Sequence, residues 1–204
     1  MAFKYNILLI LILILSLSNK KEVNNYFVVL EPQSSLTIHG ITNVNTFELS
    51  YLIKNPPVNL YPSVNATDSS YNLGIADLHV PLRQFETGNH LLKNDFLELV
   101  KEKQFPIMTV SAKSFYLSGK KLPGFFETKK GMAGVSITLG GITKTYNIPF
   151  TLKGNNQTLL IVGHQVFNIR DFNLEPPTKF FGLVHVKETI EIDFNLNVRF
   201  SRLD

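Results

Sequence analysis

The sequence predicts an all-β fold in which about eight antiparallel strands form a barrel or a sandwich. The first observation is the segment from Val184 to Phe200, whose apolar residues all stand at even positions with polar residues between them. Strict alternation of this kind is typical of a strand with one face in water and the other in the core. The second observation is that shorter segments repeat this alternation, and the third is that a single segment has helical spacing.

The predicted strands follow one another along the chain, mostly through short turns. The segments with strand-type alternation are 26–30, 36–38, 47–53, 76–80, 108–112, 135–139, 148–152, 159–167 and 184–200. The pair Gly140-Gly141 stands between two of them, and two glycines between alternating runs predict a tight hairpin. The last segment is longer than a usual strand, which favours a barrel or a strongly curved sheet.

One helix and one long loop interrupt the strands. Between Leu91 and Lys103 the apolar residues Leu92, Phe96, Leu99 and Val100 have the spacing of one helix face, and Pro106 follows soon after. Because this helix lies between two strands, we expect it to cap one end of the barrel. The stretch 53–71, with three prolines between Pro56 and Pro62, predicts a long surface loop.

The first eighteen residues have the pattern of a secretory signal peptide. Lys4 precedes an unbroken Ile and Leu run over 7–15, and small residues end at Ser18. The run is shorter than the roughly 20 residues that a membrane-spanning helix requires. We therefore predict that residues 1–18 are removed, that residues 19–204 form one β domain, and that the protein is exported, with the periplasm as its expected location. We predict no membrane-spanning segment in the mature protein.

Composition excludes several kinds of chemistry. The chain has 204 residues, no cysteine and a formal net charge of +4. Thiol nucleophiles, thiolate zinc sites and iron–sulfur clusters are therefore impossible. The charge is small and its basic residues are scattered, which does not indicate a nucleic-acid-binding surface. The 16 Phe residues provide a large apolar area to bury, either in a solid core or around a ligand.

Polar motifs do not indicate an active site. The five histidines lack the spacing of a helical zinc pair, and we expect them to be ordinary polar-face residues. Arg170 could bind a carboxylate bidentately at a strand end, although a structural pair with Asp171 is the simpler interpretation. An enzyme would need polar groups that converge in the interior, and the candidates are His39, His164, Arg170 and Asp171. We predict no enzymatic activity, no metal site and no cofactor.

Three segments together resemble the YceI-like family of exported polyisoprenoid-binding barrels. The first covers 91–97 and continues through Phe105-Pro106-Ile107-Met108-Thr109-Val110, which is similar to the family's helix and following strand. The second is the hairpin at 135–144, and the third is Phe167-Asn168-Ile169-Arg170-Asp171-Phe172. The resemblance extends over roughly 28–200. The segment 34–47 departs from the commonest form of the family and resembles that of a variant branch. Asn173 stands where the family has glycine.

The resemblance implies an antiparallel eight-stranded lipocalin-like barrel with one short helix capping an end. It also implies a tunnel-like apolar cavity that holds an isoprenoid, a quinone tail or a fatty chain. An eight-stranded barrel can either fill its interior with side chains or hold one small ligand. The expected partner is therefore an apolar lipid-like ligand, with no nucleic acid, and a homodimer is left open.

Two other functions remain open at this point. One is a partner-binding or structural module of the cell envelope with a solid core, which would use the loop between Pro56 and Pro62. The other is an enzyme that acts on an apolar substrate. For the carrier, alternation defines two faces of each strand but does not say which of them is inside. The candidate ligand-binding residues are Phe47, Leu49, Met108, Val110, Ile137, Leu139, Ile148, Phe150, Phe167, Arg170, Phe194 and Leu196.

Overall fold

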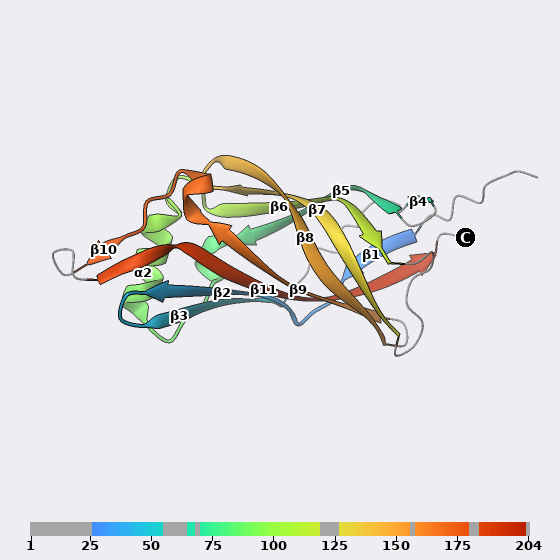
Figure 1. The fold of residues 1–204 in the computed structure, drawn as a ribbon, viewed down its shortest axis with the longest axis horizontal. Helices are drawn as coiled ribbons and strands as arrows, with labels where there is room; N and C mark the ends of the chain where they lie inside the picture. The colour runs from blue at the N-terminus through green and yellow to red at the C-terminus, as the bar shows by residue number, and fades with distance from the viewer. Residues whose placement is uncertain are drawn as a thin grey trace, which may run out of the picture.

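The computed structural model describes residues 26–54, 65–67, 70–118, 127–155, 158–179 and 184–202. Over these residues the chain is mostly β-structure, with one α-helix at one end of an elongated molecule (Figure 1). The predicted leader over 1–18 and the loop from Pro56 to Pro62 lie outside the described residues. No helix within the described ranges is long and apolar enough to cross a membrane.

An antiparallel sheet of eight main strands curls around the interior, in the order β3-β2-β11-β9-β8-β7-β6-β5. This confirms the prediction of an eight-stranded antiparallel, lipocalin-like all-β fold. Three short strands complete it: β4 pairs with β5 at the edge of the sheet, while β1 and β10 pair with β11. The strands are β1 (Tyr26–Leu30), β2 (Ser34–Thr42), β3 (Thr46–Ile53), β4 (Asn65–Thr67), β5 (Ser70–Pro81), β6 (Ile107–Leu117), β7 (Thr128–Leu139), β8 (Ile142–Asn155), β9 (Thr158–Asn168), β10 (Thr178–Lys179) and β11 (Val184–Arg202).

The curled sheet is open along one side. Among the described residues no ladder joins β3 to β5, the two strands at its edges. A single bridge between Ser50 and Glu86 connects β3 to the segment that follows β5, through hydrogen bonds of 2.8 and 2.7 Å. That segment begins with η1 (Leu82–Gln84), whose Leu82 is fully buried. The segment that leads into the helix is thus attached to the open edge of the sheet at this point.

Strand β11 is the longest element and organises one wall of the molecule. It pairs with β9 along most of its length, with β2 in its first half and with β1 in its last third. Ser34 lies at the junction of β1 and β2 and is completely buried. Its hydroxyl donates to Glu31 O at 2.8 Å and accepts from the amide of Asn197 at 3.0 Å. These bonds hold the turn between β1 and β2 against β11.

The predicted hairpin at Gly140-Gly141 is present between β7 and β8. Leu139 and Ile142 are directly paired, and the two glycines have φ values of +57° and +81°. Positive φ at both central positions is typical of a type I′ turn, the two-residue turn that best suits the twist of a hairpin. This requirement explains why two glycines occur there.

The helix α2 (His90–Leu99) closes the end of the barrel at which β10 and the β2–β3 turn lie (Figure 1). Asn89 caps it by accepting hydrogen bonds from the amides of Leu91 and Leu92 at 2.9 and 3.2 Å. The helix ends four residues before the predicted Lys103, because Lys101 adopts a left-handed conformation with φ of +56°. The amide of Glu102 then bonds to Leu97 O, as in a Schellman motif.

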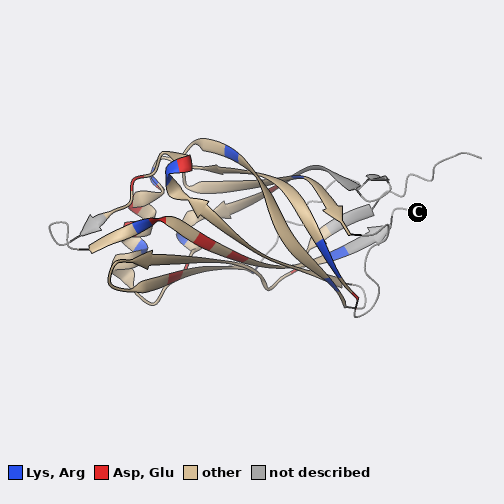
Figure 2. Ribbon diagram, in the orientation of Figure 1, with Lys and Arg blue, Asp and Glu red and all other residues tan. Residues whose placement is uncertain are grey.

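Positions of charged residues are interspersed along the strands and around the capped end (Figure 2). The interior, in contrast, is apolar. Leu49, Ile53, Val80, Phe85, Leu152 and Leu174 are almost completely buried, and Phe85 packs against Tyr51 and Phe96 with ring centroids 5.6 and 5.4 Å apart. This aromatic group joins the helix to the open edge of the sheet.

Candidate functional site

An apolar cavity of about 240 Å³ lies inside the curled sheet. Every main strand except β3 contributes to its wall, and Gln165 is its one polar residue. The Gln165 amide donates to Val166 O at 2.9 Å and so is bound to the backbone. Because an apolar cavity offers water few partners, it favours an apolar occupant. The lining residues are Leu36, Leu78, Met108, Val110, Ala112, Phe115, Ala133, Val135, Ile137, Leu139, Ile148, Phe150, Leu152, Ile161, Gln165, Phe167, Ile169, Phe172, Ile190, Ile192, Phe194 and Leu196.

A second cavity of about 170 Å³ lies between the first one and the capped end. It is also mainly apolar, and one of its walls is the inner face of α2, with Leu92, Phe96 and Leu99. We call the two spaces the inner and the outer cavity. Five residues line both of them: Met108, Leu139, Ile169, Ile190 and Ile192. These five residues, here called the neck, show that the two cavities lie end to end. The combined volume of the two cavities falls within the roughly 300–1,000 Å³ of small-molecule sites.

Three glycines explain how a Phe-rich barrel keeps an open interior. Gly40 is paired with Phe47, Gly131 with Phe150, and Gly163 with Phe194. In each pair a Cβ on the glycine would overlap the aromatic ring of its partner. Each ring therefore lies along the wall, over the glycine, and does not project across the barrel. All three Phe residues still line a cavity.

Of the candidate ligand-binding residues, eleven stand in the walls of the two cavities. Phe47 and Leu49 line the outer cavity, Met108 and Leu139 line both, and the inner cavity contains Val110, Ile137, Ile148, Phe150, Phe167, Phe194 and Leu196. Arg170 is the exception. It lies on the outside, where its Nε donates to Glu188 Oε1 at 2.6 Å. A ligand-binding role for the eleven residues stays a prediction.

The sequence analysis missed several lining residues. Ile190 and Ile192 belong to the even-numbered face of β11, so the alternation that identified Phe194 and Leu196 already contained them. The helix face at Leu92, Phe96 and Leu99 carried a helical signal and was interpreted only as a cap. Ile169 and Phe172 had no periodic signal, because they belong to the short helix η2 (Ile169–Phe172) at the end of β9.

The short helix η2 closes a seam in the wall. Strands β8 and β9 are paired only where 150–155 faces 158–163, so their other halves diverge. Tyr146 of β8 packs there against Phe167 and Phe172, at centroid distances of 4.8 and 6.3 Å. Its hydroxyl donates to Asp171 Oδ2 at 3.1 Å. Burial, assisted by this bond to the carboxylate, raises the pKa of Tyr146 to about 12.

Asp171 therefore has a structural partner other than the one expected. The predicted pair between Arg170 and Asp171 is wrong: Arg170 binds Glu188, and Asp171 binds Tyr146. The two side chains diverge because they occupy successive positions of a tight helical turn. Asn173 ends that turn with φ of +53°, a left-handed conformation that Asn tolerates better than most residues with a side chain.

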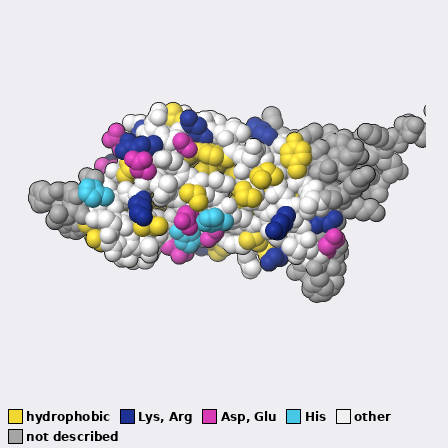
Figure 3. Space-filling view, viewed as in Figure 1, with side chains coloured by type: hydrophobic (Ala, Val, Ile, Leu, Met, Phe, Trp, Pro, Cys, Tyr) yellow, Lys and Arg dark blue, Asp and Glu magenta, His cyan; other side chains and the backbone are white. Residues whose placement is uncertain are grey.

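His39 and His164 lie on the outer face of the sheet and not in the cavities. Both donate to one carboxylate: His39 Nε2 is 2.9 Å from Asp193 Oδ2, and His164 Nδ1 is 2.8 Å from Asp193 Oδ1. Histidines and acidic side chains are seen together on this face (Figure 3). The hydrogen bond from His164, supported by the one from His39, lowers the pKa of Asp193. Within the described residues no group of three or more His, Asp or Glu side chains is arranged to hold a metal ion.

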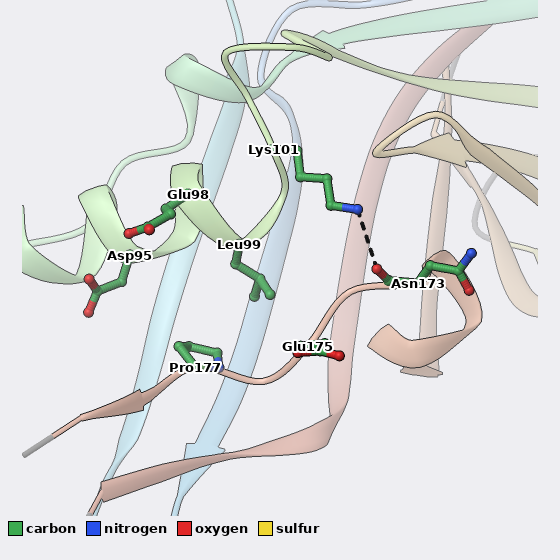
Figure 4. Close-up of a pocket in the computed structure, with 7 residues that line it drawn as sticks. All are labelled: Asp95, Glu98, Leu99, Lys101, Asn173, Glu175 and Pro177. Atoms are coloured by element: carbon green, nitrogen blue, oxygen red, sulfur yellow. Dashed lines mark hydrogen bonds between the residues drawn. The ribbon is translucent and has the colours of Figure 1, made fainter. Parts of the chain in front are cut away.

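A polar surface pocket borders the outer cavity at the capped end. It lies between α2 and the segment after η2, and Asp95, Leu99 and Pro177 line both spaces. Figure 4 shows Lys101, whose ammonium group donates to Asn173 O at 3.4 Å, while the carboxylates of Asp95 and Glu98 lie together on the helix and point away from Lys101. This pocket, of about 460 Å³, is open to solvent. The carboxylates of Asp95, Glu98 and Glu175 outnumber its one ammonium group, that of Lys101, so its walls are acidic.

Comparison with known proteins agrees with this architecture. A family model described as the YceI-like domain matches residues 58–198. None of the curated proteins matches the chain in sequence. A polyisoprenoid binding domain from Saccharophagus degradans, implicated in plant cell wall breakdown, has the same fold with a TM-score of 0.59 at 12% identity, over 84% of this chain and 97% of that one.

Two other solved structures are more distant in geometry. BcnA of Burkholderia cenocepacia is 12% identical with a TM-score of 0.46, over 85% of this chain and 95% of that one. The YceI protein of Campylobacter jejuni is 17% identical with a TM-score of 0.45, over 65% of this chain and 74% of that one. At 12–17% identity these likenesses show the fold alone.

Proposed function

The chain belongs to the YceI-like family, and from that premise we propose that it is a binding protein that holds one long apolar ligand along the axis of its barrel. The observation that carries the proposal is the pair of apolar cavities that meet at the neck. Their walls offer no charged group except Asp95, at the capped end. An extended chain is the ligand shape that fits two cavities placed end to end.

Burial of apolar surface supplies the binding energy in this proposal. Each methylene removed from water contributes about 0.8 kcal/mol, of which part is lost to ordering the chain. The ligand class follows the Saccharophagus degradans domain, whose fold this chain shares and which binds polyisoprenoid. Isoprenoid, quinone and fatty chains all meet the requirement of an unbranched or regularly methylated apolar chain. A solid-core module has no use for the two cavities, which disfavours that alternative.

The proposal includes an exported location and no catalysis. The segment 1–18 supports export, through its Lys4, its Ile and Leu run and its small residues at the end. His39, His164 and Arg170 lie outside the cavities, away from an apolar substrate, and Asp171 is bound to Tyr146. This arrangement favours a carrier over an enzyme.

Native mass spectrometry tests the proposal directly. The protein is purified from cells that contain membranes, its mass is measured under native conditions, and bound material is extracted into organic solvent. We expect one isoprenoid, quinone or fatty molecule per chain. A ligand-free mass that stays unchanged after incubation with such lipids would overturn the proposal.

A further inference from the structure

The seam between β8 and β9 is a stretch of barrel wall that has no ladder across it (Figure 1). Residues 142–149 of β8 stay paired with β7, and residues 164–168 of β9 stay paired with β11. Between these two described segments there is no backbone hydrogen bond. The two sides of the wall can therefore move apart at the seam without breaking a ladder.

Pro149 explains where the ladder between β8 and β9 stops. Because Leu139 and Ile142 flank a two-residue turn, they bond to each other, and the odd-numbered residues of β8 direct their backbone groups toward β9. Pro149 is one of these residues, and it has no amide hydrogen to donate. Pairing with β9 begins only at the next residue, Phe150. The proline thus prevents the ladder from continuing into the seam.

Gln165, the one polar residue of the inner cavity, compensates for the missing ladder. In β9 the even-numbered residues direct their backbone groups toward β8, because Val162 is the partner of Thr151. The carbonyl of Val166 therefore faces the seam, where it has no strand partner. The side-chain amide of Gln165 donates to this carbonyl at 2.9 Å. The seam is thus built to remain unpaired, since its backbone has a substitute partner.

Side chains close the seam. The ring of Tyr146 packs against Phe167 and Phe172, and its hydroxyl donates to Asp171 Oδ2 at 3.1 Å. Phe167 and Phe172 also line the inner cavity, so the cavity lies directly behind them. Separation of these rings and loss of one hydrogen bond would open the cavity to the outside.

The capped end is held more firmly. Arg83 donates two hydrogen bonds, of 2.5 and 3.2 Å, to the buried carboxylate of Glu102, which follows α2. The backbone bridge between Ser50 and Glu86 attaches the segment before α2 to β3. Local opening requires least free energy where the fewest backbone bonds and buried ion pairs resist it. This favours the seam over the capped end as the place where the wall opens.

We propose that the seam is a lateral gate, through which the apolar ligand enters and leaves the inner cavity, and that the bond between Tyr146 and Asp171 holds this gate closed. Val166 is 46% exposed and Pro149 is exposed beside it, so an approaching apolar chain meets apolar groups outside the seam as well. The inference rests on the proposed function, because a gate requires a ligand. It goes further by assigning the route that the ligand takes.

A chemical bridge across the seam tests the gate. The chain has no cysteine, so a pair of introduced cysteines reacts alone. Asn147→Cys and Val166→Cys place the pair at exposed positions that continue the register of the ladder, and a short bismaleimide joins them. Stopped-flow fluorescence measures the uptake and release of cis-parinaric acid, a fluorescent fatty acid. We expect bridging to slow both rates by about tenfold or more and to leave the affinity, which is their ratio, unchanged.

Two further bridges are the controls, each compared with its own unbridged form. Lys153→Cys and Leu160→Cys join direct partners on the same two strands, where the ladder is intact. Glu98→Cys and Glu175→Cys join α2 to the segment after η2, across the pocket of Figure 4. We expect neither bridge to change the rates. Thermal unfolding of the unbridged variants checks that each one is folded.

Tyr146→Phe tests the same gate without a bridge. Loss of the bond to Asp171 should make opening easier, so that uptake and release both become about fivefold faster, which corresponds to one hydrogen bond of about 1 kcal/mol. The affinity should stay nearly the same, since Tyr146 does not line the inner cavity. Tyr116→Phe, at an exposed position of β6, is the control and should keep the wild-type rates.

The outcomes separate the gate from the proposed function. Unchanged rates after the bridge between positions 147 and 166 would overturn the gate and leave the carrier intact. Slower exchange only after the bridge between positions 98 and 175 would assign the route to the capped end and would also overturn the gate. A wild type that takes up no probe would overturn the carrier itself, and the gate with it.

Discussion

Phe194 of β11 lies over Gly163 of β9, its direct partner in the ladder, so that the ring occupies the place of the missing side chain. The ring stays against the wall, and the inner cavity remains open beside it. We expect Gly163→Ala to push the ring toward the cavity, since a Cβ at this position would overlap it. Overpacking of this kind typically costs about 1–3 kcal/mol of stability.

Affinity for a long-chain probe should therefore fall in Gly163→Ala, as measured by fluorescence titration, with unfolding in urea measured in parallel. Gly88→Ala is the control, because a Cβ at Gly88 would meet nothing within 4 Å. Unchanged affinity and an unchanged free energy of unfolding in Gly163→Ala would contradict the role assigned to this glycine.

We expect the neck to limit the length of the ligand that can occupy both cavities. Leu139 lines both cavities, so Leu139→Phe should narrow the passage between them. We expect affinity for long primary alcohols to fall strongly, while short ones that fit one cavity bind nearly as before. A titration series of increasing chain length measures this. Leu52→Phe on β3, where Leu52 is 47% exposed, is the control. A chain-length profile that shifts equally in both variants would show that the neck does not limit the ligand.

The sequence predicted the wall of the barrel better than its ends. Alternation along β11 indicated both its length and its two faces, because a half-buried strand requires that period. It could not say which face is inside, which depends on how the sheet curls. In the structure Ile190 and Ile192 line both cavities, as Met108 and Leu139 do, so the even-numbered face of β11 is inside there.

Other features depend on contacts between distant segments and have no local pattern. The seam closed by Tyr146, Phe167 and Phe172 joins residues from β8, β9 and η2. The divergence of β8 from β9 that makes room for this group cannot be seen in the sequence of either strand. Likewise, Arg170 and Asp171 are adjacent in sequence and yet bind different partners.

Tyr146 gives the protein a sensitivity to alkaline pH. Its pKa is about 12 in the folded state and about 10 in an unfolded chain, so the unfolded state ionises first. This contribution to stability is complete below pH 10 and is lost as pH rises toward 12. Tyr146→Phe should remove that part of the pH dependence and, at neutral pH, cost about 1 kcal/mol for the lost bond to Asp171.

Urea unfolding between pH 7 and 12, with a spectroscopic titration of tyrosinate, measures both effects. Tyr116→Phe is the matched control, because Tyr116 is 54% exposed on β6. If Tyr146→Phe and Tyr116→Phe lose stability in parallel as the pH rises, the bond at the seam is not responsible.

Asp193 should contribute to stability at neutral pH and lose its contribution in acid. Hydrogen bonds from His164 and His39 lower its folded-state pKa below the ordinary 3.8. A lowered carboxyl pKa stabilises the fold above the unfolded value, and this stabilisation is lost as pH falls through the folded one. Since the cluster is exposed, Asp193→Asn should cost only about 0.2–1 kcal/mol at pH 7. The difference between variant and wild type should shrink as pH falls below 3.8 and vanish once the pH is below the lowered pKa of Asp193. Urea unfolding at pH 7 and at a series of values below pH 3.8 measures it, with the exposed Glu98→Gln as control. A difference that does not shrink at all as the pH falls below 3.8 would contradict the assigned cause.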